Sequence, residues 1–295
     1  MMKLLIACCR RWLRYPFARL CLVLMTAGGI LLALFGADVN GFRTASVDDA
    51  LLGLAGFCQV LITVPVITAL TQQELTDGVI RNKLTRGYSR GTVYLSQMLT
   101  AFLFSVICSL LLYAPLFLRA FDLLDRTMCA ETAGMLVVFT LFLPALSAVC
   151  TAVCMNAESF AGIAVCIGLL IGLFAAGIGV QDRLRSPKMT AGDPVMTDGA
   201  VQETQVPNPR FVDGTARKLL QTVSRSNPFG ARISAQNYAD LLPVLAEPGM
   251  MQAPERMEYA ERTRGELSGA PYCLIGFTVL VSGIGYAVFR RRDLR

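Results

Sequence analysis

The sequence predicts an all-α integral membrane protein with six transmembrane helices and both termini in the cytoplasm. Three observations support this fold class. The 295 residues are 54% hydrophobic and only 16% charged, whereas a soluble domain carries about 25% charged residues. The charges avoid six long stretches, and Lys and Arg are distributed unequally between the connecting segments, which sets the orientation.

Six charge-free stretches are long enough to cross a bilayer, which takes about 20 consecutive, mostly apolar residues in a helix. They are Leu20 to Ala37, Ala50 to Leu70, Val93 to Leu118, Ala133 to Met155, Phe160 to Val180, and Ala270 to Phe289. An arginine or aspartate at the centre of such a helix costs about 2.5–3.5 kcal/mol on the insertion scale. The absence of charges from all six therefore favours insertion, and the short gap between the fourth and fifth stretches predicts a helical hairpin.

The distribution of basic residues places both termini in the cytoplasm, because short cytoplasmic loops of membrane proteins are enriched in Lys and Arg. One side carries most of these residues: Lys3, Arg10, Arg11, Arg14, Arg19, Arg81, Lys83, Arg86, Arg90, Arg290, Arg291, Arg292 and Arg295. The short loops on the other side carry only Arg43, Arg119 and Arg126. We therefore expect a multi-pass protein of the cell (plasma) membrane, and we attribute the formal charge of +6 to orientation rather than to nucleic-acid binding.

The chain divides into four parts: an N-terminal interfacial helix at 1–19, spans one to five at 20–180 with a cytoplasmic loop at 71–92, an extracellular loop domain at 181–269, and the sixth span with a basic tail at 270–295. In the first part, one helical face gathers apolar residues: Met1, Met2, Leu5, Cys8, Cys9 and Trp12. Basic residues gather on the opposite face, which predicts an amphipathic helix on anionic membrane lipid. An ordinary positive anchor without a defined helix is the alternative.

The segment 181–269 is predicted to be an irregular, compact external domain, because it holds 8 of the 13 prolines and equal numbers of acidic and basic residues. One helix is expected within it, capped by Asp213 and ending before Asn227. Its apolar residues recur at helical spacing: Ala216, Leu219, Leu220 and Val223. The stretch Ser186 to Pro209 has no apolar periodicity, and we expect it to be mobile.

Catalytic, metal and cofactor sites are not expected in this chain, so we do not expect an enzyme. There is no histidine, which excludes the His-containing zinc sites, and no G-x-x-x-x-G-K-[ST] phosphate-binding loop occurs. The spans hold no ionisable residue, which argues against a carrier coupled to protons or ions.

The fifth stretch carries small residues at every fourth position: Ala164, Gly168, Gly172 and Ala176. A stripe of small residues allows another helix to approach closely. The partner helix can belong to the same chain or to a second chain in a homodimer or pseudo-dimer contact, and the sequence leaves both open.

The loop Thr71 to Arg90 (TQQELTDGVIRNKLTRGYSR) is the most specific segment of the sequence. Glu74 and Asp77 precede four basic residues, and Gly78 and Gly87 interrupt the run. A loop that only sets orientation needs neither this length nor these glycines. We therefore predict a short helix that projects from the membrane and docks on a cytoplasmic partner; a solvated basic loop is the alternative.

These residues resemble the permease subunits of type-two ATP-binding cassette (ABC) exporters. Members of that family are similar in layout, and after the second span they carry an acidic residue, a Gly-Thr-Ile-Arg-Asn-Lys-Leu-like run and then Gly-x-Ser-Arg. Here Glu74 is followed by Gly78 to Leu84 and by Gly87 to Arg90. Asn227 to Gly230 resembles an Asn-Pro-containing external segment of the family, and Phe289 to Leu294 resembles its basic ending. Two departures, Val79 for a frequent Thr and Gln97 for a frequent Lys, leave the class intact.

The resemblance implies that this loop couples to a separate cytoplasmic ABC ATPase subunit, in which ATP is hydrolysed, and that two permeases work with two ATPases. The implied coupling residues are Glu74, Asp77, Gly78, Arg81, Asn82, Lys83, Arg86, Gly87, Ser89 and Arg90. A homodimer and a heterodimer both remain open. Export is the expected direction, and the uncharged spans favour an amphipathic or apolar cargo. The alternative is a membrane-anchored sensor or accessory protein whose external loop domain binds a ligand.

Overall fold

The computed structural model describes the backbone of residues 1–35, 37–38, 46–47, 49–123, 126–157, 159–186, 188–197, 200–246 and 254–291. Within these ranges, side chains are described except at 37–38, 46–47, 49–51, 120–123, 126–131, 159–160, 189–197, 200–205, 240–246 and 254–263. The loop arginines Arg43 and Arg126 and the basic tail beyond Arg291, which the orientation prediction uses, lie outside the described side chains.

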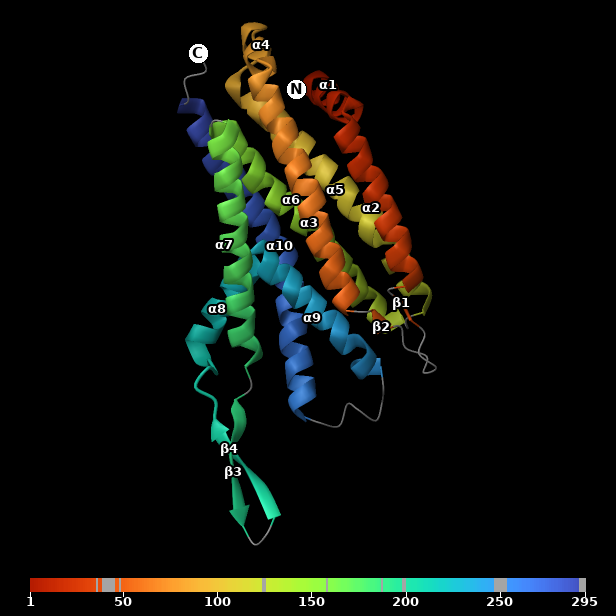
Figure 1. The fold of residues 1–295 in the computed structure, drawn as a ribbon, viewed down its shortest axis with the longest axis vertical. Coiled ribbons are helices and arrows are strands. Elements are labelled where there is room, and N and C mark those ends of the chain that lie inside the picture. The colour runs from red at the N-terminus through yellow and green to blue at the C-terminus, as the bar shows by residue number, and fades with distance from the viewer. Residues whose placement is uncertain are drawn as a thin grey trace.

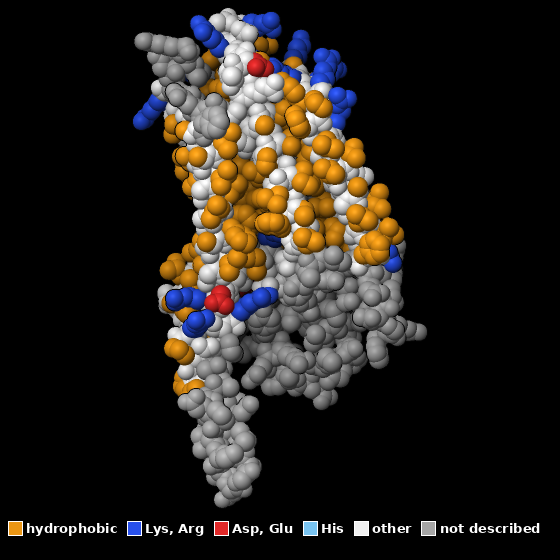
Figure 2. All heavy atoms as spheres, in the orientation of Figure 1, with side chains coloured by type: hydrophobic (Ala, Val, Ile, Leu, Met, Phe, Trp, Pro, Cys, Tyr) orange, Lys and Arg blue, Asp and Glu red, His pale blue; other side chains and the backbone are white. Residues whose placement is uncertain are grey.

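Six helices in the described part of the chain are long and apolar enough to cross a membrane, in the regions that the sequence predicts. They are α2 (Pro16–Phe35), α3 (Asp49–Thr76), α5 (Arg90–Leu123), α6 (Arg126–Asn156), α7 (Ser159–Arg185) and α10 (Pro254–Arg291). They extend along the long axis of the molecule (Figure 1). On the face shown in Figure 2, apolar side chains form a band over the middle of the bundle. The chain is a helical multi-pass membrane protein.

The N-terminus and the C-terminal end of α10 lie at the same end of the bundle, together with the short helix α4 (Val79–Thr85) (Figure 1). Lys and Arg side chains gather there, beyond the apolar band (Figure 2), so we call it the basic end. The opposite end, which we call the hairpin end, carries the antiparallel strands β3 (Met189–Thr197) and β4 (Ala200–Pro207). The two-residue strands β1 (Ala37–Asp38) and β2 (Ser46–Val47) pair between α2 and α3.

The β3–β4 hairpin occupies most of the stretch Ser186 to Pro209, which the sequence predicts to be mobile. Thr197 pairs with Ala200 beside the turn, and Met189 pairs with Pro207 at the other end of the ladder. Antiparallel pairing joins backbone N–H and C=O groups, so it forms here without the apolar periodicity that the prediction used. The stretch is a regular element and not an irregular one.

The N-terminal helix α1 (Met2–Arg14) ends where a proline follows. Tyr15 is extended, with ψ of 132°, as expected of a residue before proline, and Pro16 then opens α2. The buried side chains of α1 lie one turn apart: Leu4, Cys8 and Trp12. The ring of Trp12 packs edge-on against Phe104 of α5, with centroids 5.8 Å apart. The stripe of Leu4, Cys8 and Trp12 therefore packs against the protein itself, whereas Met1 and Met2 of the predicted apolar face are exposed.

Helix α8 (Gly214–Ser226) forms where the sequence predicts it. Its predicted cap is confirmed, because the carboxylate of Asp213 accepts a hydrogen bond from the backbone N–H of Gly214. The apolar residues of α8 do not face the protein, however, since Leu219 and Val223 are exposed while Ser224 is buried.

Helices α8 and α9 (Pro228–Ala246) form a helical hairpin that enters the bundle from the hairpin end. Its tip is Asn227, whose side-chain amide donates to the carbonyl oxygen of Leu173 at 2.8 Å. Leu173 is the midpoint of the span Ala161–Arg185. The same side chain accepts a hydrogen bond from the backbone N–H of Phe229 at 3.0 Å. This part of the predicted external domain therefore lies among the spans.

A buried polar network fastens the α8–α9 hairpin to its neighbours. Gln181 of α7 donates to the hydroxyl of Ser224 in α8 at 2.6 Å and also to the hydroxyl of Ser234 in α9. Ser234 donates to the carboxylate of Glu266 in α10 at 3.1 Å, and Gln221 of α8 donates to the same carboxylate at 3.3 Å. Because buried polar groups are stable only when they are hydrogen-bonded, this network holds four helices in one arrangement.

Candidate functional site

The loop between the second and third spans forms the predicted short helix, α4. Gly78 precedes it with φ of 65°, and Gly87 follows it with φ of 87°. Both values lie in the left-handed region, which glycine adopts without strain. Ser89 then caps α5, because its hydroxyl accepts a hydrogen bond from the backbone N–H of Thr92 at 3.2 Å. The two glycines thus turn the chain out of α3 and back into α5.

A buried ion pair joins α4 to α3. The ammonium of Lys83 lies 2.6 Å from a carboxylate oxygen of Glu74, and the side chains are 13% and 0% exposed. The same ammonium donates to the sulfur of Cys8 in α1 at 3.3 Å. With so little water nearby, the attraction is screened weakly. One ammonium therefore holds α1, α3 and α4 together.

A second ion pair joins α1 to the end of α3. A guanidinium nitrogen of Arg11 lies 3.1 Å from a carboxylate oxygen of Asp77 and 3.2 Å from the hydroxyl of Tyr15. Burial alone would lower the pKa of Arg11, but the Tyr15 hydrogen bond and the carboxylates of Glu74 and Asp77 raise it above its ordinary value. The guanidinium therefore stays charged and keeps α1 beside the loop.

Helix α4 has one face in the protein and one face outside it. Ile80 is 2% exposed and packs in one cluster with Leu4 of α1 and Val93 of α5. Arg81 and Arg86 are exposed. The basic end therefore presents a short helix with a cationic outer surface on an apolar base.

The ten predicted coupling residues have two different roles in this arrangement. Seven of them order the loop through ion pairs, caps, a hydrogen bond or backbone conformation: Glu74, Asp77, Gly78, Lys83, Gly87, Ser89 and Arg90. The other three are exposed: Arg81, Asn82 and Arg86. We call these three the α4 face. Arg90 connects the loop to α10, since its guanidinium donates to the carbonyl oxygen of Arg290 at 2.9 Å.

The structure adds Cys8 and Arg11 of α1 to this site, and sequence reasoning missed both. Their partners Lys83 and Asp77 are 75 and 66 residues away in the chain. Helical periodicity relates only residues on the same helix, so no local pattern could have predicted these contacts. The position of Cys8 on the apolar face of α1, next to the basic residues, was a weak indication of such a contact.

The small-residue stripe on α7 has no neighbour in the described part of the chain. Ala164, Gly168, Gly172 and Ala176 are all exposed, and a Cβ atom placed on Gly168 or Gly172 would meet no heavy atom within 4 Å. Of the two alternatives that the sequence leaves open, packing against another helix of the same chain finds no support among the described residues.

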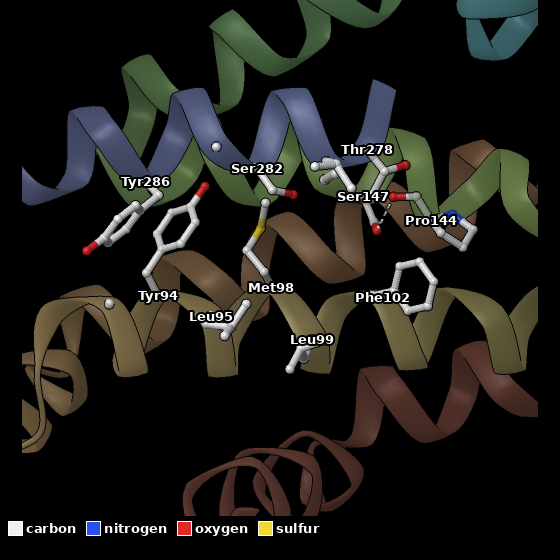
Figure 3. Close-up of a pocket in the computed structure, with 14 residues that line it drawn as sticks. Tyr94, Leu95, Met98, Leu99, Phe102, Pro144, Ser147, Thr278, Ser282 and Tyr286 are labelled. Carbon is white, nitrogen blue, oxygen red and sulfur yellow. Dashed lines mark hydrogen bonds between the residues drawn. The ribbon is translucent and has the colours of Figure 1, made fainter. Parts of the chain in front are cut away.

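An apolar cavity of about 510 Å³ lies between α5, α6 and α10, toward the basic end. Figure 3 shows Tyr94 and Met98 of α5 pointing toward Ser282 and Tyr286 of α10. The hydroxyl of Ser147 donates to the carbonyl oxygen of Pro144 in the same helix at 2.8 Å. The hydrogen of this hydroxyl is therefore used within α6, and the cavity wall is mostly apolar. The cavity can hold an alkyl chain.

Comparison with known proteins adds no assignment. No protein-family model matches the chain, and no curated protein is significantly similar to it. The site geometry and the sequence resemblance are therefore the basis for a functional proposal.

Proposed function

We propose that the chain is the membrane-spanning permease subunit of an ABC exporter, energised by a separate ATPase subunit that docks on α4. One observation supports this proposal more strongly than the others. The loop between the second and third spans is a short helix, set off by two left-handed glycines and fixed to α3 by the Glu74–Lys83 ion pair. A loop that only marked orientation would need none of these contacts.

The contacts of α4 support a mechanical role. A force on the α4 face reaches α3 through Glu74 and Lys83, and it reaches α1 through Arg11 and Asp77. It reaches α10 through the bond between Arg90 and the backbone of Arg290. ATP binding closes the ATPase dimer in this mechanism, and the docked helix passes the motion to the spans, which alternate access to a path.

The charge distribution supports docking from the cytoplasm. The basic end carries α1, α4 and the end of α10, and cytoplasmic loops are the ones that collect Lys and Arg. The hairpin end then faces the outside. In this orientation, the exposed arginines of α4 are available to acidic side chains of a cytoplasmic ATPase.

The uncovered stripe on α7 supports a second permease as partner. A Cβ atom at Gly168 or Gly172 would meet no described heavy atom within 4 Å, and such small residues let another membrane helix approach closely. Two copies of this chain, or this chain and a different permease, would enclose a path between them. The apolar cavity beside Tyr94 and Ser282 supports an amphipathic or apolar cargo.

Purification from native membranes tests the proposal. The tagged chain is extracted in a mild detergent, and the proteins that remain bound in equal amount are identified by mass spectrometry. We expect a protein with a Walker-type phosphate-binding loop, together with ATP hydrolysis in the purified complex. A folded chain that binds no such ATPase in any condition would contradict the proposal and would favour a membrane-anchored sensor or accessory protein.

A further inference from the structure

The apolar cavity between α5, α6 and α10 opens sideways from the bundle. Its lining on α5 runs from Gly91 to Phe102, about 16 Å along the axis at the usual rise of an α-helix. Leu95 of α5 and Val279 of α10 also line it, and they are 45% and 66% exposed. Both residues lie inside their spans, so the opening between α5 and α10 faces the apolar layer of the membrane.

Contacts between α5 and α10 bridge the end of the cavity that lies toward the basic end. The ring centroid of Tyr94 lies 5.8 Å from that of Tyr286 and 5.5 Å from that of Phe289. Beyond these rings, the guanidinium of Arg90 donates to the carbonyl oxygen of Arg290 at 2.9 Å. The direct route from water at the basic end is therefore obstructed, and the open route leads from the lipid.

The hydroxyl groups that line the cavity differ in how they are used. At the deep end, Thr278 donates to the carbonyl oxygen of Leu274, and Ser147 donates to that of Pro144, each within its own helix. Nearer the basic end, the hydroxyl of Ser282 points into the space between α10 and α5 (Figure 3). The deep end of the cavity therefore behaves as an apolar surface, whereas the other end offers a hydroxyl to a ligand.

The hydroxyl of Tyr94 is a buried donor without a partner. Tyr94 is 2% exposed, and its hydroxyl oxygen has no hydrogen-bond partner in the described part of the chain. This hydroxyl lies against Gly285, where a Cβ atom would overlap it, and Gly285 is one helical turn from Ser282. A buried polar group left unpaired costs about 1–3 kcal/mol. A ligand that offered an acceptor at this end of the cavity would remove that cost.

The lining indicates a neutral ligand. None of the described residues that line the cavity is charged, so a charged head group would lose its hydration without gaining a counter-ion, which is strongly unfavourable. A neutral oxygen loses less hydration and can accept hydrogen bonds from hydroxyl groups. Small-molecule sites are typically apolar cavities of about 300–1,000 Å³ with a few polar groups, and this cavity has about 510 Å³.

We propose that this cavity binds a neutral amphiphile, with its oxygen-bearing head between Ser282 and Tyr94 and its alkyl chain along Leu99 and Phe102. The ligand enters through the opening between α5 and α10, from the half of the membrane nearer the basic end. The ring of Tyr94 turns toward the cavity, and its hydroxyl then donates to the oxygen of the ligand. This assignment rests on the proposed transport function only in taking the ligand to be the cargo.

Photolabelling of the purified chain tests this site without any ATPase. The protein is placed in phosphatidylcholine nanodiscs and labelled with a 16-carbon alcohol that carries a diazirine in its chain. The matching hydrocarbon, and the matching fatty acid at alkaline pH, are the comparison probes. Labelling of α5 and α10 is divided by that of α2, which corrects for partitioning into the membrane. We expect a ratio about fivefold higher for the alcohol than for either comparison probe, as a hydrogen bond of about 1 kcal/mol produces.

Variants of the hydroxyl groups identify the residues responsible. Ser282→Ala and Tyr94→Phe are each expected to reduce the alcohol preference to about twofold, and the double variant is expected to abolish it. Tyr94→Phe removes a hydroxyl that has no partner, so the thermal unfolding temperature should not fall. Thr278→Val is the matched control and should keep the full preference, because its hydroxyl is used within α10. An unchanged preference in the folded double variant would overturn the proposal.

Filling the cavity tests the place of binding. Gly283 lines the cavity, and a Cβ atom on it would meet no described heavy atom within 4 Å, so Gly283→Leu should fold and exclude the alcohol. Gly276→Leu is the matched control, since its Cβ atom is equally unobstructed and lies two turns away on the same face of α10, outside the lining. Alcohol labelling should fall at least fivefold in the first variant only. The same labelling in both variants would place the alcohol elsewhere and refute the site.

Competition distinguishes a recognised ligand from ordinary bilayer lipid. Unlabelled hexadecanol and monopalmitoylglycerol are expected to displace the probe, whereas hexadecane and palmitate are not. Equal labelling of the native chain by alcohol and hydrocarbon would mean that lipid chains fill the cavity without recognition, contrary to the proposal. An ATPase found on α4 without an alcohol preference would leave the transport function standing and remove this site, and the converse result would do the opposite.

Discussion

The ammonium of Lys83 lies 2.6 Å from a carboxylate oxygen of Glu74, and the Glu74 side chain is completely buried. The two residues come from different helices, α4 and α3, which are also connected by the turn at Gly78 and by the apolar cluster around Ile80. The ion pair therefore restrains movement of α4 relative to the second span. The account of coupling depends on this relationship.

Removing one charge of the pair is expected to destabilise the protein. Glu74→Gln leaves the ammonium of Lys83 beside a neutral amide and the sulfur of Cys8, without its anion, and breaking a buried pair costs about 3–5 kcal/mol. The partial exposure of Lys83 places the expected loss at the lower end of this range. Thermal unfolding in detergent measures it. The double variant Glu74→Gln with Lys83→Met is expected to recover stability, because it leaves no unpaired charge. Unchanged stability in the single variant would show that the ion pair does not stabilise the fold.

Charge reversal on the α4 face is expected to impair docking of the ATPase without affecting folding. Arg81→Glu with Arg86→Glu changes two exposed side chains, so unfolding should stay within about 0.5 kcal/mol of the native value. ATPase association and transport should fall at least tenfold, because the reversed charges repel an acidic partner surface. Lys218→Glu, an exposed reversal at the hairpin end, is the matched control. Full transport in the α4 variant would exclude the coupling role of this face.

Bulky residues on the α7 stripe are expected to break the contact between two permeases. A Cβ atom at Gly168 or Gly172 would meet no heavy atom within 4 Å in the described part of the chain, so the monomers of Gly168→Leu and Gly172→Leu should fold normally. The particle mass from light scattering should change from that of a dimer to that of a monomer. Gly177→Leu is the contrasting variant, since its Cβ would lie 3.0 Å from that of Phe229 and should destabilise the monomer. An unchanged dimer in the two stripe variants would place the contact elsewhere.

The tip of the α8–α9 hairpin is expected to be sensitive to one side chain. Asn227→Ala removes the hydrogen bonds to Leu173 and Phe229 inside the bundle, and a lost buried hydrogen bond costs about 1–3 kcal/mol. Asn208→Ala also removes a side-chain-to-backbone bond, to Arg210, but at the surface, so it should be nearly neutral. Hydrogen exchange in α9 should rise in the first variant only. Equal exchange in the two variants would mean that Asn227 does not anchor the hairpin.

The sequence predicts the spans well because a bilayer imposes a simple rule, a long run without charges. All six regions are confirmed as helices, with ends that extend into polar residues, such as Thr76 in α3. The helix capped by Asp213 is also confirmed, since caps are local signals. The positions of α4 and its two glycines follow from the same local chemistry.

Helix α9 could not be recognised from length and charge as an element that packs among the spans. It contains Arg232 and is flanked by prolines, which made the segment resemble an external one. Its buried residues are small or amphipathic and recur at helical spacing: Ala231, Ala235, Tyr238 and Ala239. That spacing was a usable signal for a buried helix. The contacts of Arg232 with α3 and α6, in contrast, depend on tertiary packing that no local pattern contains.

The different roles of the predicted coupling residues could be assigned only from the fold. By composition alone, Glu74 and Arg81 are both charged residues of one loop. Burial separates them, because Glu74 is inside and Arg81 is exposed. A charge reversal at both positions together would therefore mix a loss of stability with a loss of docking, and the two must be tested separately.

Photo-cross-linking from position 86 in living cells tests the central claim most directly. A photoreactive amino acid replaces Arg86 on the α4 face, and the adduct is identified by mass spectrometry, with the same replacement at Lys218 as the reference. The account predicts a cytoplasmic protein with a Walker-type phosphate-binding loop, captured at position 86 and absent at position 218. Adducts only with external proteins, or labelling of position 86 by a membrane-impermeant reagent in intact cells, would contradict it.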